Sequence, residues 1–390
     1  MRVPSLIALT LLGGLGSLAA HAQDLTPDES FRDASWSPEG VERIWLTVWP
    51  EAIDDTRVVL IGSQKERMQA GVYDLTTREM KTFALNLPAA DKLLRLSKGR
   101  FLVYGPEAVS IFDVDTAEPL NNYNMRGPRI DAIAANVVAG HPVVITASLS
   151  KDDKRIFTAN VLAPDTYAVA KAFTLAEADP KISPWMGLWH IDADGFIYAA
   201  GDTDSGSFAH VWRLTSSGDA FNVKQVVAAS PCKSPVGQRP GVNSLSVVEG
   251  ATGVTFHQLV SGFESGKRVY RAVTVSISRT GAATSTDVPV TGIKTELTRP
   301  RVVYRKGEVL TFAHVDENGS GKALYTTIDF KSGRAVKTAE LQLVRKSGEP
   351  LAGVGSHLGL VKAGKLQLQA VSVFHMSSTG VVWNACALKP

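Results

Sequence analysis

The chain has little cysteine, little net charge and no long hydrophobic run beyond its N-terminus. Its 390 residues include two cysteines, too few for a disulfide framework or a cysteine-based zinc site. The formal net charge at pH 7 is +3, so bulk electrostatics give no reason to expect nucleic acid as a partner. Hydrophobic residues make up 44% and charged residues 20%, which is typical of a globular protein and excludes a disordered or coiled-coil chain.

The local motifs of several common enzyme chemistries are also absent. The sequence contains no Gly-x-Ser-x-Gly nucleophile elbow, no His-Glu-x-x-His zinc motif and no phosphate-binding glycine loop. These absences favour a protein without catalytic activity. They do not exclude an enzyme, because a site assembled from separate parts of the chain leaves no local motif.

The N-terminus predicts export. A short basic start with Arg2 precedes an apolar stretch, Leu6–Leu18, and the small-residue pattern Ala20-His21-Ala22. This arrangement is typical of a secretory signal peptide covering residues 1–22 and cleaved after Ala22. The apolar stretch is shorter than the roughly 20 residues that a membrane span needs. We therefore expect a periplasmic or secreted protein that does not span the membrane, with an uncleaved N-terminal anchor as the alternative.

A repeated strand–turn–strand unit runs along the rest of the chain. Each copy has an alternating apolar strand followed by a short turn rich in Thr, Ser, Asp and Gly, as an antiparallel hairpin requires. The unit recurs about every 50 residues, within the range of propeller repeats, and prolines fall in the connectors between units. The strands are Gly71–Leu75, Val109–Val114, Ile156–Leu162, His210–Leu214, Val273–Ile277, Tyr325–Phe330 and Val371–Met376.

Four short strands in a unit of this length make a blade of a β-propeller. No linker or change of composition divides the chain, and no stretch after residue 40 has the period of a long amphipathic helix. We predict an all-β protein, a single β-propeller with seven four-stranded blades in residues 41–390; six or eight blades are alternatives. Because the last blade lacks a strand, the N-terminal segment 23–40 is expected to close the ring with a strand within Ser30–Ser37.

Short phrases of the sequence resemble blades of known propeller families. Ile191–Tyr198 is similar to the strand–turn–strand of NHL-type and lyase-like blades. Tyr73–Thr77 and Ile328–Arg334 resemble the hairpins of quinoprotein-like and YVTN-type blades. These resemblances cover only short segments, so they imply the fold and no specific family or activity.

Basic residues gather in four neighbouring connectors. Connectors of a propeller share one face around the mouth of the central channel, where converging cations would attract anions. Trp185 and Trp189 could stack there on a sugar ring or a peptide side chain. The alternative is a set of ordinary solvated loops. The candidate ligand-binding residues in and near these connectors are Arg126, Arg129, Lys181, Trp185, Arg239, Arg299 and Arg301.

Two histidines are further candidates. His190 and His357 fall in predicted innermost strands, whose side chains can face the channel, where an imidazole could bind a metal or act as a general base. A hydrogen-bonded histidine within a sheet is the alternative, and we include only His190 among the ligand-binding candidates. Asp202–Gly206 and Asp316–Gly319 have oxygen donors like those of calcium loops, although hairpin turns need the same residues. We expect no metal, no cofactor and no catalytic residue.

The sequence thus predicts an exported binding protein without catalysis. It would engage a protein segment or an anionic ligand on its connector-loop face, the partner being a cell-envelope protein or an anionic small molecule or glycan. The alternative is an enzyme, a lyase or hydrolase that acts on an anionic sugar or ester at the channel mouth. That alternative requires His190 or His357 to approach an acid or a metal. Cys232 and Cys386 could pair, but we prefer two unpaired thiols.

Overall fold

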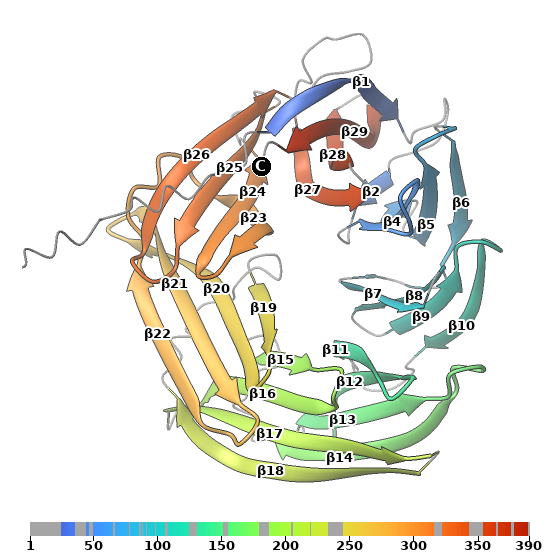
Figure 1. Ribbon diagram of the computed structural model, residues 1–390, viewed down its shortest axis with the longest axis vertical. Helices are drawn as coiled ribbons and strands as arrows, with labels where there is room; N and C mark the ends of the chain where they lie inside the picture. The colour runs from blue at the N-terminus through green and yellow to red at the C-terminus, as the bar shows by residue number, and fades with distance from the viewer. Residues whose placement is uncertain are drawn as a thin grey trace, which may run out of the picture.

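The structure is a computed structural model (Figure 1). In the part of the chain that it describes, all regular secondary structure is β-strand. The structure describes residues 25–35, 44–46 and most of 50–388; its longer gaps there are 125–130, 179–186, 233–244, 316–321 and 343–353. For the strands within 25–46 and 354–388 it describes the backbone only. No helix in the described residues is long and apolar enough to cross a membrane.

The strands form seven antiparallel sheets arranged in a ring (Figure 1). Six of them are blades built from consecutive strands, numbered here as blades 1 to 6. Blades 1 to 3 comprise β2 (Ile44–Leu46), β4 (Arg57–Gln64), β5 (Arg67–Asp74) and β6 (Met80–Ala84), with β3 (Glu51–Ala52) paired to β4; β7 (Lys92–Ser97), β8 (Arg100–Gly105), β9 (Ala108–Asp113) and β10 (Glu118–Asn124); and β11 (Asp131–Val138), β12 (His141–Leu149), β13 (Arg155–Leu162) and β14 (Val169–Ala178).

The second half of the ring follows the same order. Within each blade the chain runs from an innermost strand outward, so β7, β11, β15, β19 and β23 surround the centre (Figure 1). Blades 4 to 6 comprise β15 (Leu188–Ile191), β16 (Phe196–Thr203), β17 (Gly206–Ser217) and β18 (Ala220–Cys232); β19 (Leu245–Gly250), β20 (Gly253–Glu264), β21 (Lys267–Ser278) and β22 (Ala283–Pro289); and β23 (Thr298–Lys306), β24 (Val309–Val315), β25 (Lys322–Asp329) and β26 (Arg334–Gln342).

The last sheet joins the two ends of the described chain. It contains β27 (Val354–Ala363), β28 (Leu366–His375) and β29 (Ser378–Leu388), and the N-terminal strand β1 (Leu25–Ser35) pairs antiparallel with β29. The predicted all-β propeller with four-stranded blades is confirmed. The predicted count of seven blades differs from the structure, in which six blades, not seven, are continuous stretches of chain. The remaining sheet combines β27, β28 and β29 with the N-terminal strand β1. Pairing with β1 leaves β29 no open edge.

The two faces of the ring carry different parts of the chain. Connectors between blades and the loops between second and third strands lie on one face, here the connector face. The turns between first and second strands, and between third and fourth strands, lie on the other, here the turn face. Antiparallel order within every blade produces this division, because the chain reverses direction at each strand.

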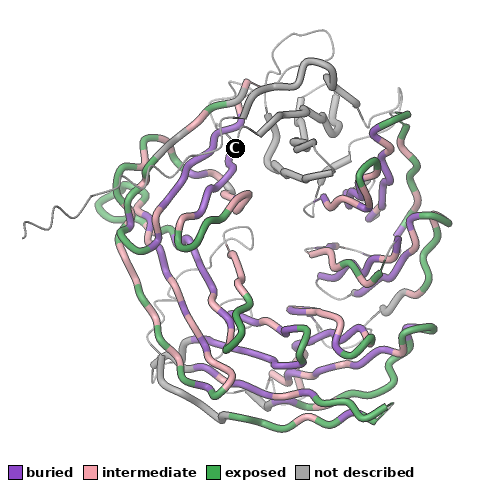
Figure 2. Tube along the Cα trace, in the orientation of Figure 1, coloured by how far each residue is buried: buried purple, intermediate pink, exposed green. Residues whose placement is uncertain are grey.

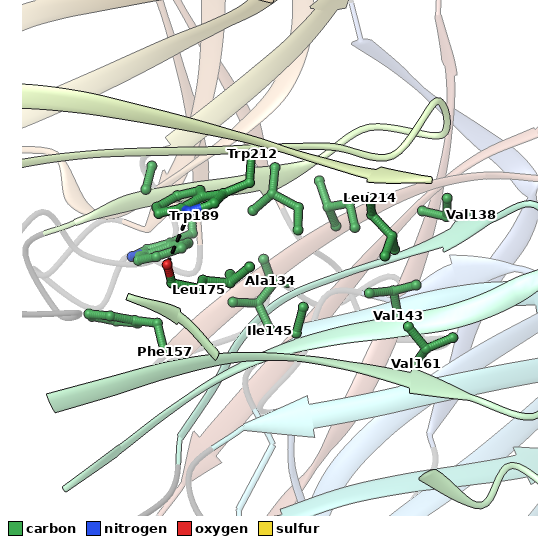
Figure 3. Packing of buried hydrophobic residues seen from close by; sticks show 14 of the residues in the cluster. Ala134, Val138, Val143, Ile145, Phe157, Val161, Leu175, Trp189, Trp212 and Leu214 are labelled. Carbon is green, nitrogen blue, oxygen red and sulfur yellow. Dashed lines mark hydrogen bonds between the residues drawn. The ribbon is translucent and has the colours of Figure 1, made fainter. Parts of the chain in front are cut away.

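Blades pack face to face through apolar side chains at alternate strand positions. Between blades 3 and 4, Phe157, Trp189 and Trp212 stack in succession, with ring centroids 4.6 Å and 5.9 Å apart (Figure 3). The Nε1 of Trp212 donates a 3.1 Å hydrogen bond to the Leu175 carbonyl, which satisfies its polar atom (Figure 3). Burial is greatest in the middle strands, and exposed residues gather on outer strands and turns (Figure 2). Each boundary between consecutive blades from 1 to 6 is therefore a separate apolar core layer.

The ring also separates the two cysteines. Cys232 ends β18, Cys386 lies in β29, and these strands are on opposite sides of the ring (Figure 1). A disulfide requires Cα atoms within about 7 Å of each other. The fold therefore favours two unpaired thiols.

Candidate functional site

The described residues include few of the predicted ligand-binding side chains. Arg126, Arg129, Lys181, Trp185 and Arg239 all lie outside the described residues, so the basic rim stays a prediction. The backbone of Arg299 belongs to β23, but its side chain is not described. Among the predicted residues, the structure describes the side chains of His190 and Arg301.

Arg301 is buried and does not extend into solvent from a loop. Its side chain belongs to inner strand β23, where Arg301 pairs with Ala313 after a register shift, and it is 6% exposed. This burial lowers the pKa of Arg301 to about 10, because a charged guanidinium loses solvation. Arg301 is therefore part of the blade interior, and substituting it would disturb the fold.

Trp189 is not available for stacking on a ligand. It is 7% exposed and lies between the rings of Phe157 and Trp212, in the core between blades 3 and 4 (Figure 3). The expectation that Trp189 could hold a sugar or peptide group is therefore wrong. Its strand position turns it toward blade 3 instead.

His190 contacts a carboxylate from the next blade. Its Nε2 lies 2.8 Å from Oε1 of Glu249, and the side chains are 19% and 45% exposed. The imidazole also meets Phe256 edge to face, with centroids 6.4 Å apart. His190 belongs to β15 and Glu249 to β19, so the contact joins the innermost strands of blades 4 and 5 (Figure 1).

The pKa of His190 lies below its ordinary value. Burial is the main cause, since it disfavours the imidazolium; Glu249 opposes the shift, and the charge of Lys92 adds to it. Lys92 starts β7, and its Nζ lies 3.5 Å from the carbonyl of Ile133 in β11. Side chains from the innermost strands of blades 2, 4 and 5 thus interact electrostatically. We call Lys92, His190 and Glu249 the central cluster.

The chemistry of the central cluster is that of a proton acceptor held by a carboxylate, together with a cation on another inner strand. A neutral imidazole held by a carboxylate can accept a proton at neutral pH, and an ammonium group attracts anions. Groups with perturbed pKa values often mark functional sites. The requirement that His190 approach an acid is met. The side chain of His357, in β27, lies outside the described residues.

Metal binding receives no support from the described residues, which contain no group of three or more potential histidine, cysteine or carboxylate ligands. Asp202 pairs with Ser207, and Thr203 pairs with Gly206, so the first calcium-like segment forms a tight β16–β17 hairpin. The second, Asp316–Gly319, lies outside the described residues.

Sequence reasoning missed Lys92 and Glu249. Glu249 precedes Gly250 in an ordinary strand-and-turn sequence, and Lys92 begins a short strand. No local pattern relates either residue to His190, because their proximity depends on the order of blades around the ring.

Comparisons with known proteins assign the chain to no family. No protein-family model matches the chain, and no curated protein matches it. Similar solved structures include the Dos1 propeller, with TM-score 0.48 and 9% identity over 93% of this chain and 95% of that one. U3-55K has TM-score 0.46 and 8% identity over 92% and 99%. Quinohemoprotein alcohol dehydrogenase from Comamonas testosteroni has TM-score 0.44 and 10% identity over 88% and 76%. The chain is a β-propeller that these comparisons place in no specific family.

Proposed function

We propose that the protein is an exported β-propeller that binds an anionic ligand or a protein segment on its connector face. The observation that carries the proposal is the position of Lys92 at the connector-face end of an inner strand. Lys92 is the first residue of inner strand β7, where the chain enters blade 2 from the connector face. Its Nζ lies 3.5 Å from the Ile133 carbonyl of the neighbouring inner strand, β11.

The predicted basic connectors extend the same surface. The sequence predicts Arg129 and Arg239 in connectors, and Arg299 is the second residue of inner strand β23. Several cations around one opening raise the local concentration of anions, and salt weakens this attraction. Loops fixed by a rigid scaffold are also common positions for binding residues.

A pull-down tests the proposal. The mature protein is used as bait on its own cell envelope, at low and high salt, beside a variant with Lys92, Arg129, Arg239 and Arg299 all changed to Ala. We expect a stoichiometric partner that salt releases and the variant fails to capture, while circular dichroism shows an intact fold. The control changes four cations away from this face, Lys81, Lys171, Lys331 and Arg334, to Ala. Capture by the connector-face variant would overturn the assignment of the surface.

A second candidate function is favoured by the 2.8 Å contact between His190 and Glu249. It is an enzyme, a lyase or hydrolase acting on an anionic sugar or ester, in which His190 accepts a proton and Glu249 orients the imidazole. A panel of esters and uronic-acid glycans tests it, with His190→Gln and Glu249→Gln beside the unchanged protein. Turnover abolished by His190→Gln would support the enzyme, and no turnover on the panel would leave the binding protein as the better account.

A further inference from the structure

A row of three side chains crosses blade 4 near its turn face. The strand register places Phe196 of β16 opposite Arg213 of β17, and Arg213 opposite Lys224 of β18. Residues directly opposite on antiparallel strands share a face, with Cβ atoms about 4.5–5.5 Å apart. Phe196 is buried, Arg213 is half-buried and Lys224 is exposed. Two cations therefore lie side by side at the outer part of the blade.

This pair of cations lacks a compensating anion. Like charges directly opposite each other destabilise a sheet. Within the part of the chain that the structure describes, neither Arg213 nor Lys224 forms an ion pair. The Nε of Arg213 is buried and has no hydrogen-bond partner, which is a further cost. An anion bound between the two side chains would relieve the repulsion.

The guanidinium of Arg213 is held in place by an aromatic ring. Its Cζ lies 4.1 Å from the centroid of Phe196, and the Cζ of Arg279, from the β21–β22 turn of blade 5, lies 4.7 Å from the same centroid. Arg279 is already neutralised, since it contacts Asp194 and lies 3.2 Å from Oδ2 of Asp192. Arg213 therefore differs from Arg279 in having a positioned charge and no carboxylate.

The ring itself is fixed by the turn that precedes it. Oδ1 of Asp192 accepts a 2.8 Å hydrogen bond from the Phe196 amide. Gly195 has φ +85°, and a Cβ there would lie 2.4 Å from the Leu214 carbonyl oxygen, so the turn requires glycine. The turn therefore fixes the position of the Phe196 ring that contacts Arg213.

We propose that Arg213 and Lys224 form a binding site for an oxyanion, namely a phosphate, sulfate or carboxylate group. A guanidinium presents two parallel N–H donors to such a group, and an ammonium adds a point charge. The next opposed pair toward the turn, Thr215 and Asn222, is exposed and adds polar side chains to the same face. The site lies toward the turn face, away from the connector surface, so it is independent of the proposed function.

Anion-dependent thermal unfolding of the full mature chain tests the site. Sodium phosphate, sulfate and acetate are titrated separately against chloride at constant ionic strength, which separates specific binding from screening. We expect the melting temperature to rise with at least one oxyanion. Lys224→Gln should lower the affinity for that oxyanion about tenfold, the loss expected for one charge-assisted hydrogen bond. The matched control is Lys171→Gln, an exposed lysine on outer strand β14 opposite Val161, which should respond like the unchanged protein.

A charge reversal supplies a second readout. Lys224→Glu places a carboxylate opposite Arg213, so we expect a higher melting temperature without oxyanion and no further response to it. Lys224 is exposed, so neither variant disturbs the core. The proposal is overturned if no oxyanion acts beyond chloride, if Lys224→Gln and Lys171→Gln weaken the response equally, or if Lys224→Glu keeps the full response. The connector-face variant should keep the oxyanion response, so failure of the proposed function would be seen separately.

Discussion

Removing the Asp192 carboxylate should destabilise the propeller more than removing any exposed acid nearby. Asp192 is 4% exposed, and its carboxylate accepts hydrogen bonds from the Phe196 amide at 2.8 Å, the Tyr198 hydroxyl at 3.1 Å and the Arg279 guanidinium at 3.2 Å. The first two bonds shape the β15–β16 hairpin of blade 4. The third joins that blade to blade 5.

The expected cost follows from these three contacts. Asp192→Ala leaves a buried hydroxyl and an amide without their acceptor and removes one carboxylate from Arg279, so we expect a loss of about 3–5 kcal/mol in the free energy of unfolding. Asp192→Asn keeps an acceptor for the Phe196 amide but loses the charge, so its cost should be smaller. Urea unfolding followed by tryptophan fluorescence measures both values.

Asp194 provides the control for Asp192. Its carboxylate also contacts Arg279, but its side chain is 60% exposed, and an exposed ion pair contributes about 0–1 kcal/mol. Asp194→Ala should therefore cost much less than Asp192→Ala. If the two variants unfold at the same urea concentration, the assignment of Asp192 as the residue that fixes this turn is refuted.

Three further predictions concern the central cluster, the core and ring closure. Burial lowers the pKa of His190, so the folded state favours the neutral imidazole, and the stability that His190 contributes is present above about pH 6.5 and is lost as the pH falls. The variant His190→Gln should therefore make urea midpoints less dependent on pH between 8 and 5. An unchanged dependence on pH would contradict this reasoning. Trp189→Ala should cost about 3–5 kcal/mol, read from urea unfolding, because the cavity lies between two aromatic rings; a cost below 1 kcal/mol would show that the layer collapses around it. A chain without residues 1–35 should self-associate in size-exclusion chromatography, because β29 then has an open edge, whereas a chain without residues 1–22 should stay monodisperse.

The sequence was most informative where strand and turn patterns coincide. In blade 4, the predicted strands Gly187–Ile191 and Phe196–Ala200 and the turn between them correspond to β15, β16 and a hydrogen-bonded turn in which the Gly195 amide donates to the Asp192 carbonyl. Alternation with period two gave the strands correctly, because it depends only on local geometry. The pattern does not indicate which neighbouring blade each face of a strand contacts. Trp189 was for that reason placed near a ligand, although it packs against blade 3.

The functional residues were harder to predict because their contacts cross blade boundaries. His190 was expected near the ring centre from its strand alone. Its partner Glu249 is in the next blade, and Lys92, whose charge lowers its pKa, is two blades away. A single sequence carries no signal for such contacts when each residue is typical of its own strand. The paired cations Arg213 and Lys224 depend in the same way on register, which shifts between Val211 and Trp212.

Contacts of arginine and histidine side chains with carboxylates join neighbouring blades of this propeller. Four of them lie at or near turns of the turn face, where a side chain of one blade reaches the adjoining blade. Each of them joins two adjoining blades, and each group involved has a partner in the next blade. Arg213 and Lys224 have no such carboxylate in the described residues, so their charge remains for a ligand. The four pairs are Arg57–Asp115, His190–Glu249, His257–Glu308 and Arg279–Asp194.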